Sequence, residues 1–280
     1  MQVMIKLSKI NWLTDLLTPL AVILMESLCI YPWLVFLGKW PLLTENRDIL
    51  SLPSVLIIIG GTYLGTKFFR NGKMGLPLAR TGIVLAAVII IFAVIRLEYH
   101  NGFPLFSGDW FVSYARTMLD IFAHLHPVAI AIPFAFFLCW RGINRGQRAM
   151  HFYNIYPSFL IGMASLVLLV IIWSFRTGTG TVVDLTAKVG VYIAGFFFSG
   201  LTALALTNLQ TIGVRLKKKE GAPATFNRRW LGIVLGIISG TVLLGAGIAG
   251  AFSSQFIVFL SKAAGFIWSL IERAAYYIFL

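Results

Sequence analysis

Glu26 is the residue whose place in the sequence points most directly to chemistry. It lies near the middle of an apolar run, DLLTPLAVILMESLCIYPWLVFLG, which covers residues 14–37. An acidic side chain at that depth in a bilayer is costly, and such residues often carry protons or cations along a transport path. Glu26 is therefore a proton- or ion-coupling candidate. The alternative is a structural polar contact between neighbouring helices.

A second group of titratable residues follows in the region 109–126. Arg116, Asp120 and His124 are spaced four residues apart, which places them on one face of a helix. Asp120 and His124 are the other proton- or ion-coupling candidates. His124, His126 and Asp109 are the residues that would best suit a metal ion. Their spacing matches no established metal signature, so we predict no bound metal. A ladder of interfacial ion pairs is the alternative.

Motifs for nucleophilic, hydrolytic or nucleotide chemistry are absent from the sequence. It contains no G-x-S-x-G, no H-E-x-x-H, no P-loop and no dinucleotide-binding glycine motif before a helix. We therefore assign no catalytic residue and no cofactor, and a non-enzymatic role is favoured over an enzymatic one.

The composition defines the elements that must hold these residues. Of the 280 residues, 59% are hydrophobic and 12% are charged, and the mean hydropathy is +0.87. The apolar residues fall in runs of about 20, the length that crosses a hydrocarbon core of about 30 Å as a helix. We predict an all-α fold, a polytopic transmembrane bundle of about eight helices that forms a single integral membrane domain over 1–280. The expected helices are 14–37, 52–69, 76–95, 117–140, 155–175, 182–208, 230–252 and 256–280.

The distribution of the 23 Lys and Arg residues predicts the orientation. Most of them fall at the N-terminus and in alternate loops, including Arg141, Arg145 and Arg148 in the loop after the fourth run. Cytoplasmic loops are enriched in basic residues, so we expect a cytoplasmic N-terminus. The same rule explains the net charge of +13, and no nucleic-acid partner is predicted.

Two loops are expected to contact the membrane surface. The segment 96–116 is rich in aromatic residues and is predicted to lie on the outer interface. The cytoplasmic segment 209–229 is predicted to contact anionic lipid headgroups. Its basic residues are Arg215, Lys217, Lys218, Lys219, Arg228 and Arg229.

Glycines at four-residue spacing mark two helix-packing faces. Gly232, Gly236 and Gly240 form a doubled GxxxG in the seventh run, and Gly61 and Gly65 form a single one in the second. Such stripes let helix backbones approach closely in lipid. Packing within the chain is the favoured interpretation, with a homodimer or another membrane protein as the alternative partner. Either interpretation makes these faces buried.

The segment FNRRWLGIVLGIISGTVLLGAGIAGAFSS, the following AFSSQFIVFL and the earlier CWRGINRG at 139–146 resemble a known family. They resemble the membrane-spanning region of bacterial membrane-anchored transglutaminase-like proteins, and especially relatives that lack the transglutaminase core. The resemblance covers roughly 130–280. It implies a place in the bacterial cell envelope and a cytoplasmic tail beyond the last helix. No cysteine falls in a predicted loop, so no catalytic residue is carried over.

These features favour a non-enzymatic protein of the bacterial inner membrane that scaffolds or anchors a cell-envelope assembly. A proton-coupled transporter or channel using Glu26 is the alternative, since prolines would break the first and fourth helices around a midplane site. A lipid-modifying enzyme is the third hypothesis. Its outer-face residues would be Asp109, Asp120, His124 and His126.

Overall fold

The computed structural model describes residues 16–39, 48–72, 75–99, 108–119, 126–176, 189–209 and 232–245. Within these ranges the regular secondary structure is entirely helical. Six helices carry labels: α1 (Thr18–Gly38), α2 (Leu52–Asn71), α3 (Leu76–Tyr99), α4 (Asp109–Leu119), α5 (Pro127–Gln147) and α6 (Phe152–Arg176). The helices Val189–Leu209 and Gly232–Gly245 follow.

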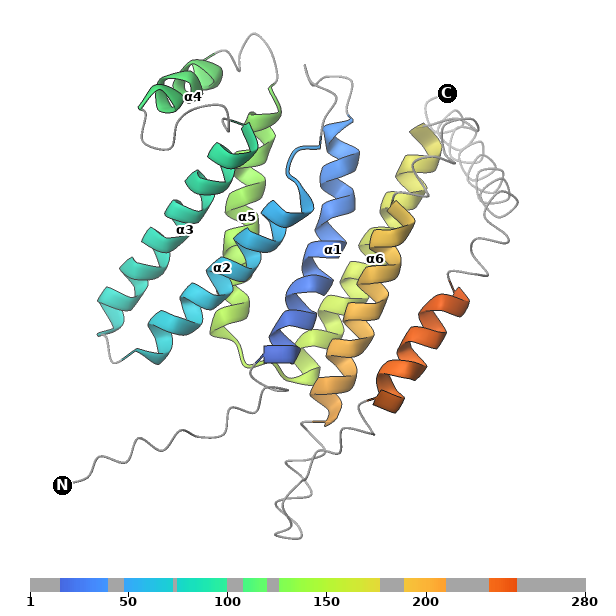
Figure 1. Cartoon of the computed structure of the whole chain (residues 1–280). Helices are drawn as coiled ribbons and strands as arrows, with labels where there is room; N and C mark the ends of the chain where they lie inside the picture. Colours follow the sequence, from blue (N-terminus) through green and yellow to red (C-terminus); the bar gives the residue numbers. More distant parts are fainter. Residues whose placement is uncertain are drawn as a thin grey trace, which may run out of the picture.

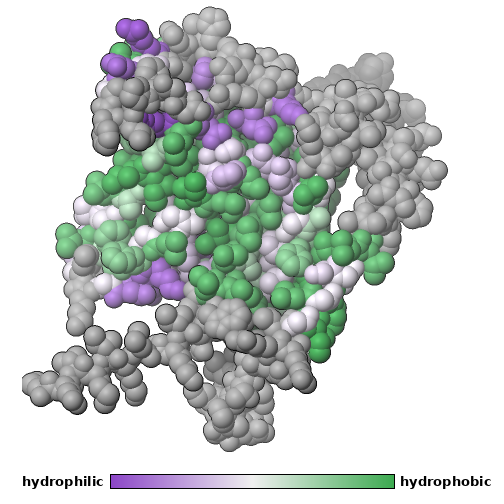
Figure 2. All heavy atoms as spheres, viewed as in Figure 1, coloured by the Kyte–Doolittle hydropathy of each residue, from purple (hydrophilic) through white to green (hydrophobic). Residues whose placement is uncertain are grey.

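Six of the described helices are long and apolar enough to cross a membrane: α1, α2, α3, α5, α6 and Val189–Leu209. Their lengths match the hydrocarbon thickness at 1.5 Å per residue. Figure 2 shows an apolar band across the middle of the visible face, with hydrophilic residues gathered at its two ends. The described part of the chain is thus all-helical, and the chain is a multi-pass membrane protein.

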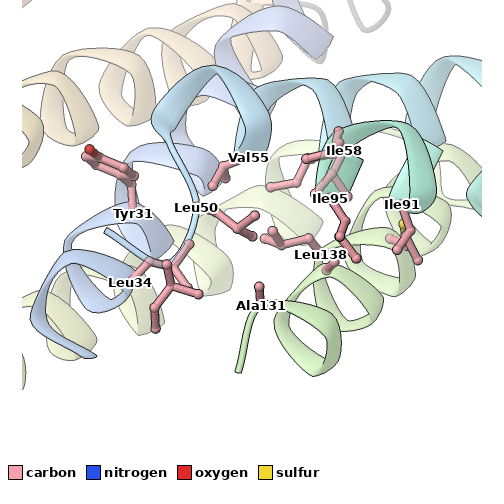
Figure 3. Close-up of a cluster of buried hydrophobic side chains, with 14 of the residues drawn as sticks. Tyr31, Leu34, Leu50, Val55, Ile58, Ile91, Ile95, Ala131 and Leu138 are labelled. Carbon is pink, nitrogen blue, oxygen red and sulfur yellow. The ribbon is translucent and has the colours of Figure 1, made fainter. Parts of the chain in front are cut away.

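Helix α1 occupies the centre of the bundle. Figure 1 shows α2, α3 and α5 on one side of it, and α6 with the Val189–Leu209 helix on the other. The first side buries a cluster around Leu34, Ile58 and Leu138, and Figure 3 shows these side chains converging from different helices. The second side buries Met25 with Phe159 and Phe196, whose rings stack at 5.4 Å. Residues on α1 therefore belong to both cores.

The predicted fourth helix, 117–140, begins at the wrong place. Helix α5 starts at Pro127, and the extended residue His126 caps it by accepting the Val128 N–H at Nδ1 (3.3 Å). Proline lacks an N–H and disfavours the helical conformation of the residue before it, so it suits the first helical position. Arg116 consequently lies on the separate helix α4, while residues 120–125 fall outside the described ranges.

Internal prolines do not break the membrane helices as expected for a transporter. Helix α1 continues through Pro32 and α5 through Pro133. One missing N–H is tolerated where neighbouring helices hold both halves in place. The prediction that prolines break the first helix is therefore wrong, whereas the predicted fourth helix is interrupted at Pro127, where α5 begins, and not at Pro133. The predicted last helix, 256–280, lies outside the described residues.

Helix α4 lies across the end of α3, as Figure 1 shows. Trp110 and Tyr114 contact Phe92 at ring-centroid distances of 6.5 and 6.4 Å, and the Arg96 guanidinium stands 5.4 Å from the Trp110 ring. Burial raises the pKa of the Tyr114 hydroxyl. An amphipathic helix held by aromatic residues at the end of a spanning helix fits an interfacial segment.

Candidate functional site: an arginine-clamped glutamate

Glu26 lies inside the bundle, in the first half of α1, with 2% of its surface exposed. Its two carboxylate oxygens accept bonds from two arginines of α5. Arg141 Nε donates to Oε2 at 3.1 Å, and Arg145 Nε donates to Oε1. Both carboxylate oxygens are therefore occupied by cationic donors, the strongest class of hydrogen bond available to a carboxylate.

Arg145 extends the network from α5 to α6. Its Nη1 donates to the backbone oxygen of Asn154 at 3.3 Å, and its Nη2 donates to the Ser158 hydroxyl. The planar guanidinium thus uses its fork of donors on two different helices at once. One side chain joins α5 to both α1 and α6.

Arg141 and Arg145 were expected in the loop after the fourth helix, and that placement is wrong. Both lie in the last two turns of α5, which ends at Gln147. These two basic residues therefore reach into the bundle, where both bind Glu26. Removing either partner from a buried ion pair leaves an uncompensated charge, which costs more than the intact pair contributes.

The α2–α5 contact fixes the position of these arginines. A Cβ at Gly142 would collide with Thr62 Oγ1 and lie 2.7 Å from the Ile59 oxygen. A Cβ at Gly146 would lie 2.7 Å from Thr66 Cβ. Both threonine hydroxyls bond carbonyls of their own helix, so the surface they present to α5 is compact. Gly142 and Gly146 thus form a GxxxG seam.

The sequence signal for both features is the repeat RGINRG at 141–146. Residues four apart lie on one helix face, so the repeat places the arginines on one face and the glycines on the adjacent one. The glycines pack on α2 while the arginines reach α1 and α6. Sequence reasoning quoted this segment only for its family resemblance and missed the pattern.

A second polar cluster lies at the opposite end of the bundle. Glu98 at the end of α3 accepts from the Ser51 N–H (3.2 Å), the Ser51 hydroxyl (3.0 Å) and the Ser54 hydroxyl (2.6 Å). Ser51 is the N-cap of α2. A carboxylate at a helix N-terminus interacts favourably with the helix dipole. Asp48 nearby accepts from the Tyr31 hydroxyl at 3.0 Å.

Among the other predicted site residues, the described ones, Asp109 and His126, do not join Glu26. Asp120 and His124 lie outside the described residues, so their proton- or ion-coupling role remains a prediction. Asp109 is exposed at the start of α4, whereas His126 caps α5 through Nδ1. Across the described ranges, no three His, Cys, Asp or Glu side chains group closely enough to hold a metal ion.

The predicted glycine faces have different surroundings. A Cβ at Gly61 would lie 3.0 Å from Ile90, and one at Gly65 would lie 3.9 Å from Ala86, so this pair faces α3. No described atom lies within 4 Å of a Cβ placed at Gly232, Gly236 or Gly240. What packs on the 232–240 stripe remains a prediction. The basic stretch Arg215, Lys217, Lys218, Lys219, Arg228 and Arg229 lies outside the described ranges.

Comparison with known proteins gives no relative: no family model, no curated protein and no solved structure matches this chain.

Proposed function

We propose that this chain is a non-enzymatic scaffold or anchor in a bacterial inner membrane, with its N-terminus in the cytoplasm. The observation that carries the proposal is the Glu26 network. The most deeply buried charge described in the bundle is used to join α1, α5 and α6. Its partners belong to the framework of the protein.

A carrier role would place different demands on Glu26. A proton carrier must exchange its proton with water on each side in turn, so its carboxylate must gain access to a water-filled path. Glu26 is 2% exposed. Releasing it would break both of its bonds to the arginines that join α1 to α5. Its environment therefore favours a structural role.

The charge distribution supports the orientation. At the end of the bundle where α2 meets α3 and α5 meets α6, six described residues are basic and one, Glu26, is acidic. The basic ones are Lys67, Arg70, Arg80, Arg141, Arg145 and Arg148. The opposite end has fewer described basic residues, Lys39, Arg96, Arg116 and Arg176, and it also carries the other described acids, Asp48, Glu98 and Asp109. The positive-inside rule then assigns the basic end, and with it the start of α1, to the cytoplasm.

Mild crosslinking in native membranes followed by purification of the full chain tests the scaffold. We expect a defined adduct with another membrane protein or with a second copy of the chain. The family resemblance of residues 130–280 points to a cell-envelope protein as the partner. Recovery of an uncrosslinked monomer across a range of crosslinker lengths would refute the proposal.

A proton-coupled transporter is the second candidate function, since an acid buried in a spanning helix is the residue type such proteins use. Vesicles reconstituted with the wild-type chain or with Glu26→Gln distinguish the two. The scaffold predicts no proton flux above that of empty vesicles in either case. A wild-type flux that disappears in Glu26→Gln would establish the transporter instead.

A further inference from the structure

We propose that Arg141 binds a phosphate group at the basic end of the membrane domain. Arg141 donates one hydrogen bond to Glu26, from its Nε atom. Its Nη1 and Nη2 atoms donate to no described residue, and 31% of its side chain is exposed. Arg145, by contrast, is 12% exposed and uses Nε, Nη1 and Nη2 within the bundle. Arg145 is therefore fully used within the bundle, whereas Arg141 has two donor atoms left for a ligand.

The described charges at this end of the bundle favour the binding of an anion. Glu26 supplies one negative charge against the two guanidinium groups it joins. Arg70 and Arg148 add further positive charge at the same end, and no other described acid lies there. An uncompensated cation within a membrane domain is costly. A phosphate offers the opposite charge and oxygens that match the guanidinium fork.

The depth of Arg141 suits a ligand at the bilayer surface. It lies six residues before Gln147, the end of α5, which is about 9 Å at 1.5 Å per residue. A long arginine side chain spans much of that distance by extending toward the interface. Asn144, half-buried and three residues further along α5, lies on the same helix face. The i, i+3 spacing thus provides a neutral amide on the helix face that carries Arg141.

The phosphate has two possible sources, the headgroup of an anionic phospholipid or a free phosphate ion. Both use the same donors of Arg141, and the experiment separates them. The site goes beyond the proposed function, because it depends on the free face of one arginine and not on whether the protein acts as a scaffold.

The test uses the full-length chain in dodecylmaltoside micelles. The thermal unfolding midpoint is measured with added phosphatidylglycerol, with phosphatidylcholine and with inorganic phosphate, each against the same protein without ligand. The variants are Arg141→Gln and, as a matched control, Arg80→Gln, which removes an exposed arginine from α3 at the same end. The midpoint of each variant with ligand is compared with its own midpoint without ligand, so that ligand binding is separated from any change in the stability of the variant.

We expect phosphatidylglycerol to raise the midpoint of the wild type and of Arg80→Gln. We expect its apparent affinity for Arg141→Gln to be roughly tenfold weaker, because a charge-assisted pair is lost. Stabilisation by inorganic phosphate that also depends on Arg141 would make free phosphate the source. An equal response of Arg141→Gln and wild type to every ligand, or no response of the wild type to either anion, would overturn the site.

If Arg141→Gln does not fold, Arg141→Lys replaces it. Lysine keeps the charge but has a single amine, so it cannot bind Glu26 and present a free fork to phosphate. We expect the anion response of this variant to be weakened, whereas an undiminished response would overturn the proposal.

Discussion

Arg145 on α5 holds Glu26 on α1 with Nε and reaches α6 with both Nη atoms. The Arg145 guanidinium thus connects three helices, α1, α5 and α6. Helix association in lipid lacks a hydrophobic driving force, so close packing and polar contacts must specify which helices meet. The GxxxG seam of α5 and the Glu26 network supply these two kinds of contact on adjacent faces of one helix.

Removing the acid should destabilise the bundle strongly. Glu26→Ala leaves Arg141 and Arg145 without their shared counter-ion, and breaking a buried pair in this way costs about 3–5 kcal/mol. Unfolding of the full chain in mixed micelles by SDS titration measures the loss. Arg80→Ala, which removes an exposed arginine, should change the free energy of unfolding by less than about 0.5 kcal/mol. Equal stabilities of the two variants would exclude the network as a stabilising element.

The α2–α5 seam should not accept even one methyl group. We expect Gly142→Ala to cost about 1–3 kcal/mol through overpacking, because its Cβ meets Thr62 and the Ile59 carbonyl. Adding Thr62→Ala should recover part of the loss, since the carbonyl contact remains. The same SDS titration provides the measurement. Gly190→Ala, whose Cβ meets no described atom within 4 Å, is the matched control, and a loss there as large as at Gly142 would contradict the seam.

Glu98 should stabilise the end opposite the arginines. Glu98→Ala leaves the Ser51 and Ser54 donors without their acceptor, which should cost about 1–3 kcal/mol. Hydrogen exchange followed by mass spectrometry should show faster exchange in the first turn of α2. Asp109→Ala removes an exposed acid near the same end and should leave that turn unchanged. Unaltered exchange in Glu98→Ala would rule out this role.

The proposed orientation is tested with single cysteines. With Cys29 and Cys139 replaced by alanine, a membrane-impermeant maleimide applied to cells whose outer membrane has been permeabilised should label Asp109→Cys. It should label Gly72→Cys and Arg148→Cys only after the inner membrane is opened, because the proposed orientation places the basic end in the cytoplasm. The opposite pattern would invert the topology.

The sequence predicted the membrane helices because its signal is continuous along the chain. A run of about 20 apolar residues has one stable arrangement in lipid, so α1, α2, α3 and α6 lie within a few residues of the expected ranges. The start of α5 was missed because residues 117–126 are apolar enough to extend the hydropathy-based prediction of the helix toward the N-terminus. The proline rule, which places Pro127 at the first helical position, carried the better signal.

The site was predicted only in part. Glu26 stood out because an acid within an apolar run is rare, but its partners are more than 100 residues away along the chain. Arg141 and Arg145 also fit the positive-inside rule, so they were interpreted as cytoplasmic loop charges and not as partners of Glu26. Which helix faces meet depends on packing between distant segments, and one sequence does not encode that pairing in a local pattern.

A double-mutant cycle between Glu26 and Arg145 tests the central claim most directly. The free energy of unfolding is measured for the wild type, Glu26→Gln, Arg145→Gln and the double variant. If the pair joins α1 to α5, the coupling energy should be about 1.5 kcal/mol or more, because removing the second charge relieves the cost of leaving the first one unpaired. Additive losses, with a coupling energy near zero, would contradict the claim.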